Sequence, residues 1–328
     1  MADYKGIKGF KVQSLASDPT ADEGQIWYNT ASNTLKYDTI GAGTWASGGT
    51  TNTARSAASG AGISTAAVGC GGVPYPTPGV ATTLSETYNG SAWTETNALN
   101  TATSYLAVTG TSTAAIKAAG GPIGPVGTEV ETYNGTSWSV SPTTVNTPRY
   151  GNSAAGTTTA TLITGGRTPP PSGLVEDFNG TTWSEETDLT TARKYLVGAK
   201  NGTPTAALVF GGGLPSHPWK QGTTESWNGT SWTTVNPLGT DRYSGGSCGT
   251  QTTALCFGGA SPAKVNTESY DGTSWTEVGD LGKASYGVCS GGNSGSSDAI
   301  FALGWKTAPG LSSEEWTKAA TVKTVTVT

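Results

Sequence analysis

The sequence predicts an all-β protein, and the prediction rests on its composition, a repeated turn motif and the spacing of that motif. The 328 residues include 48 Gly, 11 Trp and 12 Tyr but one Met, and 12% are charged. Thr, Tyr, Trp and Val suit a half-buried pleated surface, whereas Gly and Asn-Gly suit tight turns. Residues that favour helices are scarce. Many short strands joined by tight turns are therefore expected.

The turn motif recurs five times and consists of Glu, an aromatic residue two positions later, Asn-Gly or Asp-Gly, and Trp three positions after that Gly. The copies span 86–93, 131–138, 176–183, 225–232 and 268–275. Their Glu residues are 45, 45, 49 and 43 positions apart. Asn-Gly holds the positive φ angles of a type I′ turn, so each copy is predicted to be a β-hairpin. A period near 45 residues is typical of a propeller.

The stretch before each hairpin supplies the inner half of a predicted blade. It is rich in Gly, Ala and Ser, as expected where blades converge and leave little room for side chains. Five inner hairpins end in Gly-Gly and a degenerate sixth ends near Leu303-Gly304-Trp305. We therefore predict a β-propeller of six four-stranded blades, with seven as the alternative. The last strand is expected either from 322–327 or from the segment from Leu35 to Trp45.

The predicted domains are an N-terminal segment, 1–48, and the propeller, 49–328. Within the propeller, two sets of repeated residues are assigned structural roles. The tryptophans are expected to be buried between blades: Trp93, Trp138, Trp183, Trp232 and Trp275. The glutamates are expected to accept hydrogen bonds from backbone donors, because one reaction does not need an identical acid in every blade: Glu86, Glu131, Glu176, Glu225 and Glu268.

The order Gly-Gly, Glu-x-Tyr, Gly-x-x-Trp and Thr-x-Arg resembles the kelch repeat over roughly residues 50 to 316. That resemblance implies a kelch-like propeller. An Arg opens the first strand of four units, at 55, 149, 193 and 242, but Ser104 and Ser285 replace it in the other two. Those two blades are expected to lack the anchoring that Arg supplies.

The N-terminal segment carries a second resemblance. Asp18-Pro19, followed by 24–30 and 33–37, resembles a short hairpin near the starts of many bacteriophage tail-fibre and related virion proteins. The resemblance implies that this region attaches the chain to other virion proteins. It also implies that the distal domain is displayed, in several copies per particle.

Composition argues against several other classes of protein. The net charge is −5 with no Lys/Arg cluster, so a nucleic-acid partner is not expected. No apolar run approaches 18 residues and the start lacks the apolar core of a signal peptide, so we expect synthesis in a host cytoplasm and no membrane insertion. The four Cys residues, at 70, 248, 256 and 289, are expected to be buried thiols, with a Cys248–Cys256 disulfide as the alternative.

The sequence contains few residues of the kinds that carry out catalysis or bind a metal. A single histidine, His217, excludes a multi-His metal centre, and with it the copper site of the kelch oxidases. No cofactor, metal or catalytic residue is expected. Glycoside hydrolysis would need two carboxylates about 5 to 9.5 Å apart, and the spacing of Asp241, Glu185 and Glu186 selects none of them.

A binding role has more support, because the loops after each Gly-Gly vary while the hairpins repeat. Aromatic and cationic residues beside Pro-stiffened loops suit a glycan or a protein interface. The candidate binding residues are Tyr75, Arg167, His217, Trp219, Lys220 and Trp305. Equally, they could cap the hydrophobic ends of the blades. We expect a virion structural protein that binds the host surface, with a carbohydrate-active enzyme or a pure scaffold as alternatives.

Overall fold

The computed structural model describes residues 12–19, 25–40, 43–76, 79–121, 127–215, 219–260, 262–302, 304, 311–318 and 320–325. Within these residues the strands form seven four-stranded sheets and one two-stranded sheet. The chain divides into two compact units, one of residues 44–317 and one that combines 1–43 with 318–328. Among the described residues, no helix is long and apolar enough to cross a membrane.

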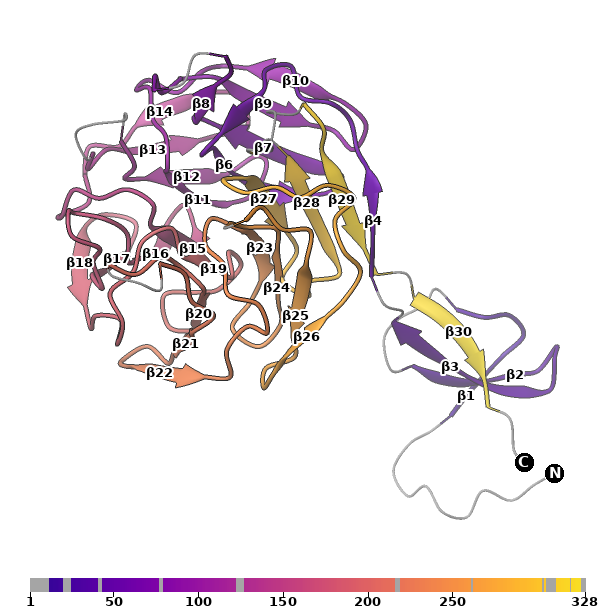
Figure 1. The fold of residues 1–328 in the computed structure, drawn as a ribbon. Helices are drawn as coiled ribbons and strands as arrows, with labels where there is room; N and C mark the ends of the chain where they lie inside the picture. Colours follow the sequence, from indigo (N-terminus) through magenta and orange to yellow (C-terminus); the bar gives the residue numbers. More distant parts are fainter. Residues whose placement is uncertain are drawn as a thin grey trace. The chain divides into compact units, whose positions relative to one another are not determined.

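The larger unit is a β-propeller of six four-stranded blades (Figure 1). The bounds of the strands, from the innermost to the outermost of each blade, follow. Blade 1 is β6 (Ser59–Ile63), β7 (Ala66–Cys70), β9 (Ser85–Tyr88) and β10 (Trp93–Thr96); blade 2 is β11 (Ala107–Gly110), β12 (Ala115–Ala118), β13 (Val130–Tyr133) and β14 (Trp138–Val140); blade 3 is β15 (Ser153–Thr157), β16 (Ala160–Thr164), β17 (Val175–Phe178) and β18 (Trp183–Glu186). Blade 4 is β19 (Val197–Gly198), β20 (Ala207–Phe210), β21 (Thr224–Trp227) and β22 (Trp232–Val235); blade 5 is β23 (Gly246–Gly249), β24 (Ala254–Phe257), β25 (Thr267–Tyr270) and β26 (Trp275–Glu277); blade 6 is β27 (Cys289–Gly292), β28 (Asp298–Ala302), β29 (Glu314–Thr317) and β4 (Thr44–Ser47).

A strand from the N-terminal side closes the ring. Strand β4 pairs antiparallel with β29 of the last blade, with Trp45 opposite Trp316. Trp45 packs against Phe257 at 4.8 Å between ring centroids, and its Nε1 donates to Thr267 Oγ1 at 2.9 Å. Of the two closures that the sequence left open, the N-terminal one is therefore correct and the C-terminal one is wrong.

The smaller unit is a sheet made from both ends of the chain. Strands β1 (Gln13–Leu15) and β2 (Ile26–Asn29) are parallel, whereas β2 with β3 (Thr34–Ile40), and β3 with β30 (Ala320–Thr324), are antiparallel. The expected boundary at 48/49 is corrected by these pairings, because Thr44–Ser47 completes a blade while the C-terminal strand pairs with β3.

Asp18 holds the turn of the smaller unit together. Its Oδ1 accepts hydrogen bonds from Trp27 Nε1 at 3.1 Å and Asn29 Nδ2 at 2.6 Å, and its Oδ2 lies 2.7 Å from Lys36 Nζ. The hydrogen bond and charge of Lys36 lower the pKa of Asp18. Trp27 is fully buried. The residues of the N-terminal motif are thus bound to one another.

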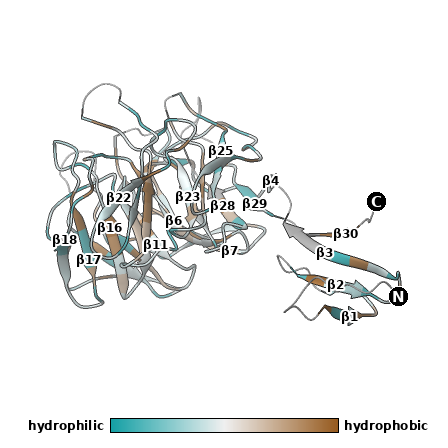
Figure 2. Cartoon of the chain, turned by 90° about the horizontal axis from the view of Figure 1, so that it is seen from below, coloured by the Kyte–Doolittle hydropathy of each residue, from teal (hydrophilic) through white to brown (hydrophobic). Residues whose placement is uncertain are grey.

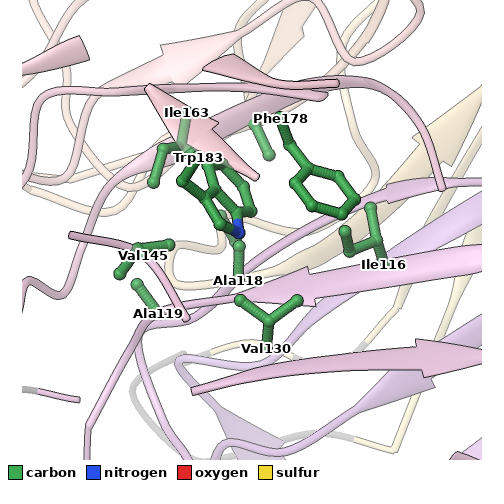
Figure 3. Packing of buried hydrophobic residues seen from close by; sticks show 10 residues of the cluster. Ile116, Ala118, Ala119, Val130, Val145, Ile163, Phe178 and Trp183 are labelled. Carbon is green, nitrogen blue, oxygen red and sulfur yellow. The ribbon is translucent and has the colours of Figure 1, made fainter. Parts of the chain in front are cut away.

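Six hydrophobic clusters fill the six interfaces between neighbouring blades. In the interface between blades 2 and 3, Trp183 lies over Ala118 and Val145 of the preceding blade (Figure 3). Hydrophobic colour is concentrated on strands inside the propeller in Figure 2. Four of the five repeated tryptophans are buried and Trp275 is partly buried. Each interface thus buries at least one large indole, worth up to roughly 4 to 6 kcal/mol at about 25 cal/mol/Å².

The repeated Glu residues are buried and tie each blade to the segment before it. Glu225 accepts hydrogen bonds from Thr190 N at 2.8 Å and pairs with Arg193 at 2.7 Å, and both members of the ion pair are fully buried. Arg193 also donates to the carbonyl of Gly211 at the Gly-Gly turn. The same ion pair occurs in the blades that contain Arg55, Arg149 and Arg242.

The two blades without this Arg differ from each other, which corrects the expectation that both lack an anchor. In blade 2, the buried Lys117 Nζ lies 4.0 Å from Glu131 Oε1 and supplies the missing positive charge from β12. In blade 6, Glu314 Oε2 accepts from Gly282 N at 2.6 Å. Glu314 Oε1 and Ser285 Oγ have no hydrogen-bond partner among the described residues.

All four cysteines are buried and none forms a disulfide. The alternative Cys248–Cys256 bridge is therefore wrong. The strand register explains why, because Cys248 lies opposite Leu255 and Cys256 lies opposite Ser247. Residues on adjacent register positions point to opposite faces of a sheet.

Candidate functional site

A ring of backbone hydrogen bonds surrounds one end of the propeller axis. Each blade contributes one residue just before its innermost strand, and we call these six residues the mouth ring: Ala57, Tyr105, Gly151, Tyr195, Ser244 and Gly287. The N–H of each donates to the carbonyl of its counterpart in the preceding blade, at 2.6 to 2.8 Å, and the sixth bond returns to the first residue. All six have φ between 51° and 64°. The closed ring fixes the side chains beside it.

Tyrosines from five blades gather at this ring. Tyr105 and Tyr195 belong to the ring, and Tyr150, Tyr243 and Tyr286 stand immediately before it. Ring centroids of Tyr105 and Tyr195 lie 5.3 Å apart, and those of Tyr195 and Tyr243 lie 6.1 Å apart. Burial is the main cause that raises the pKa of Tyr105, Tyr195 and Tyr286, so these phenols stay neutral at physiological pH.

Four of these five tyrosines, all except Tyr150, line a cavity of about 400 Å³, which we call the mouth cavity. Its walls include Tyr105, Tyr195, Tyr243 and Tyr286, with Val73 at one side. A neighbouring side cavity of about 200 Å³ is lined by Lys194, Tyr195, Gly213, Trp219 and Tyr243. Among the described residues that line the two cavities, none is Asp or Glu. Both cavities share Tyr195 and Tyr243, so together they form one aromatic surface.

Two cations border this surface. The Arg167 guanidinium lies 5.9 Å from the centroid of Tyr150, and Lys194 Nζ lies 5.4 Å from that of Tyr195. Burial and the charge of Arg167 lower the pKa of Lys194. Cations placed over aromatic faces are attracted to the ring quadrupole, which holds both side chains at the mouth.

The structure brings together part of the binding set predicted from sequence. Trp219 is 59% exposed beside Tyr195 and Tyr243, and Arg167 stands over Tyr150. Tyr75 is 54% exposed on the loop after Val73 but does not line either cavity. Lys220 is half-buried, and its charge lowers the pKa of Lys264. His217 and Trp305 lie outside the described residues.

Sequence reasoning missed the tyrosine cluster. A signal was present, because Tyr150 and Tyr243 directly follow the repeated Arg, Tyr195 follows it by two positions, and Tyr105 and Tyr286 follow the Ser that replaces it. The motif was assigned to the structure of the blade, so its aromatic partner was not considered as a binding residue.

Below the mouth ring, an axial channel of about 90 Å³ runs between the innermost strands and is closed by Lys200. Lys200 lies five positions after its mouth-ring residue, where the other five blades have Gly62, Gly110, Gly156, Gly249 and Gly292. Its Nζ donates to the carbonyls of Gly60 in blade 1 and Ser290 in blade 6, both at 2.7 Å. Lys200 comes from blade 4, so its side chain crosses the channel.

Burial lowers the pKa of Lys200 to about 8. In the unfolded chain a lysine titrates near 10.4. Between pH 8 and 10.4 the unfolded chain binds more protons at this lysine than the folded chain does, so the stability of the fold rises with pH. Below pH 8 the charged Lys200 destabilises the fold by its full amount, and above 10.4 this destabilisation is gone.

We therefore expect the stability of the wild type relative to Lys200→Met to increase between pH 7 and pH 10.5, by at most about 3 kcal/mol, at 1.36 kcal/mol per pKa unit. Urea denaturation of both proteins across this range measures the difference. The pKa of Cys289, about 11 beside Lys200, lies above this range and rises further when the lysine is removed, so the folded thiol stays mainly protonated in both proteins. A difference that is constant with pH would contradict the lowered pKa.

Comparison with known proteins establishes the fold alone. No protein-family model and no curated protein matches the chain. Among solved structures, one described as the structure of YjhT matches with a TM-score of 0.64. The match covers 84% of this chain and 99% of that chain, at 11% sequence identity. The likeness supports the β-propeller architecture and carries no residue roles.

Proposed function

We propose that this protein is a bacteriophage virion component whose propeller binds a glycan of the host surface through the mouth cavity. The observation that carries the binding part is the convergence of tyrosines from four blades, Tyr105, Tyr195, Tyr243 and Tyr286, on one cavity of about 400 Å³. That volume falls within the range of small-molecule sites, about 300 to 1,000 Å³.

The chemistry of the mouth fits a saccharide better than a flat protein surface. Aromatic rings present apolar faces for the C–H side of a sugar, and they lose little conformational entropy on binding. Lys194 and Arg167 add hydrogen-bond donors at the edge of the cavity. Trp219 extends the aromatic surface outward at the side cavity.

The attachment part of the proposal rests on the resemblance of the N-terminal segment to virion attachment hairpins. It gains support from the smaller unit, in which Asp18, Trp27 and Asn29 of the motif form one bonded cluster. Ile26 and Tyr28 alternate along β2 with the buried Trp27 and Asn29 and are exposed at 52% and 37%. We assign contact with other virion proteins, in several copies per particle, to this unit.

Replacing Trp219 with Ala should lower affinity for the host glycan at least tenfold, which corresponds to about 1.4 kcal/mol. Tyr243→Ala should act in the same direction, because Tyr243 lines both cavities. The measurement is binding of the full chain to a microarray of bacterial surface polysaccharides, followed by titration of the best ligand. Val140→Ala, on an outer strand at a residue 60% exposed, is the matched control.

Other outcomes would favour the two alternatives. Unchanged glycan binding in both variants would contradict binding at the mouth cavity. A full chain that binds no glycan would favour a scaffold that contacts virion proteins alone. Release of sugar fragments from a bound polysaccharide would favour the enzyme. The candidate acids Glu185 and Glu186 lie on the outer strand β18, away from the lining of the mouth, so their replacement by Gln tests that alternative separately.

A further inference from the structure

The charge of Lys200 has no carboxylate near it in the part of the chain that the structure describes. Its ammonium group contacts carbonyl oxygens of Gly60 and Ser290, with Ser59 Oγ at 3.5 Å. The titratable groups that face it are the thiols of Cys289, Cys70 and Cys248.

The thiols of Cys289 and Cys70 do not balance the charge, because they stay protonated at neutral pH. Burial raises the pKa of Cys289 to about 11 and that of Cys70 further. Lys200 is partly buried. A cation that is taken out of water without a counter-charge destabilises a fold, and an anion beside it offsets that cost.

The axial channel offers space for such an anion. A water molecule needs roughly 10 to 15 Å³ of cavity in this measure, so about 90 Å³ accommodates several waters or an ion of comparable size. Its lining residues include Ser59, Ser153, Ser247 and Ser290 as well as Lys200.

Hydroxyl donors remain available in this space. Ser247 Oγ donates to the carbonyl of Gly198 at 2.7 Å, and Ser290 Oγ accepts from Ser247 N at 3.1 Å. A hydroxyl that accepts a hydrogen bond still has its own hydrogen to donate. Ser290 can therefore donate to a ligand next to the ammonium group that its own carbonyl contacts.

The channel adjoins the mouth cavity. The two linings have Ala57, Tyr105, Tyr195, Ser244 and Gly287 in common, and all five residues belong to the mouth ring.

We propose that the axial channel binds a small monovalent anion, of the size of formate, between Lys200 and the serine hydroxyls. The site lies below the mouth ring and is separate from the glycan surface proposed above. The fold provides it by placing one lysine at a position where five of the six blades have glycine.

Thermal unfolding of the full chain tests the proposal with sodium formate as the probe, in a buffer whose other anions are too bulky for the channel. The melting temperature of the wild type should rise with formate concentration and follow the saturable form RT ln(1 + [L]/Kd). Lys200→Met should show no saturable rise. Lys283→Met, at an exposed lysine, should behave like the wild type.

A second measurement does not depend on the folding of the variant. Formate should raise the pKa of Lys200 in the wild type, by one unit for each factor of ten by which formate binds the charged amine more tightly than the neutral amine. NMR of the ammonium group measures this pKa. Equal melting shifts in the wild type and Lys200→Met, or an unchanged Lys200 pKa, would overturn the proposal.

Discussion

A chain cut to residues 48–317 should fail to form a stable propeller, whereas a chain of residues 44–317 should unfold cooperatively at a temperature close to that of the intact protein. The two chains differ by strand β4, Thr44–Ser47, which completes blade 6. The shorter chain loses the indole of Trp45 from its contacts with Phe257 and Trp316. That loss is worth up to roughly 4 to 6 kcal/mol.

The missing strand has a second consequence. Without it, β29 (Glu314–Thr317) becomes an open edge, and open edges pair with other chains. A typical domain is stable by about 5 to 15 kcal/mol, so the combined loss is a large fraction of the total. Calorimetry and size-exclusion chromatography of both chains measure the effect. Identical melting temperatures for the two chains would show that β4 contributes nothing to the stability of the propeller.

Arg193→Met should lower the free energy of unfolding by about 3 to 5 kcal/mol. The change removes a fully buried guanidinium from Glu225 and leaves the carboxylate without a counter-charge. It also removes donors from the carbonyls of Gly211, at 2.9 Å, and Thr223, at 2.6 Å. Guanidinium denaturation monitored by Trp fluorescence measures the loss.

The double variant Arg193→Met, Glu225→Gln provides the control for this prediction. Gln keeps an acceptor for Thr190 N but carries no charge, so the double variant should lose less stability than Arg193→Met alone. If both proteins lose the same amount, then the lost packing of the Arg side chain, rather than the uncompensated charge, explains the effect.

The repeated hairpins made the blades predictable because their information is local. Asn228-Gly229 and its counterparts dictate a tight turn, but the expected type I′ turn is wrong, because Gly229 has φ +91° while Asn228 is not among the residues with positive φ. Trp227 pairs with Trp232 across a four-residue loop, in which Asn228 Oδ1 accepts hydrogen bonds from Thr230 N and Ser231 N. The strands on either side follow from the alternation of buried and exposed residues. The order of strands within each blade then follows from the short connections between them.

Features that depend on contacts outside the repeated motif could not be predicted in the same way. In four other blades the partner of the repeated Glu is an Arg before the innermost strand, whereas in blade 2 it is Lys117 on the strand next to Glu131. Lys200 reaches across the axis to Gly60, 140 residues earlier in the chain. The mouth cavity likewise arises because closure of the ring brings Tyr105, Tyr195 and Tyr286 together.

The chain enters the propeller at Thr44 and leaves it at Thr317, and these two residues are register partners on adjacent strands. The propeller is therefore an insertion between β3 and β30 of the smaller unit, which pair directly with each other. Domain insertion is tolerated where the two ends of the inserted part are close together. The terminal sheet can therefore accept, in place of the propeller, another domain whose two ends lie equally close together.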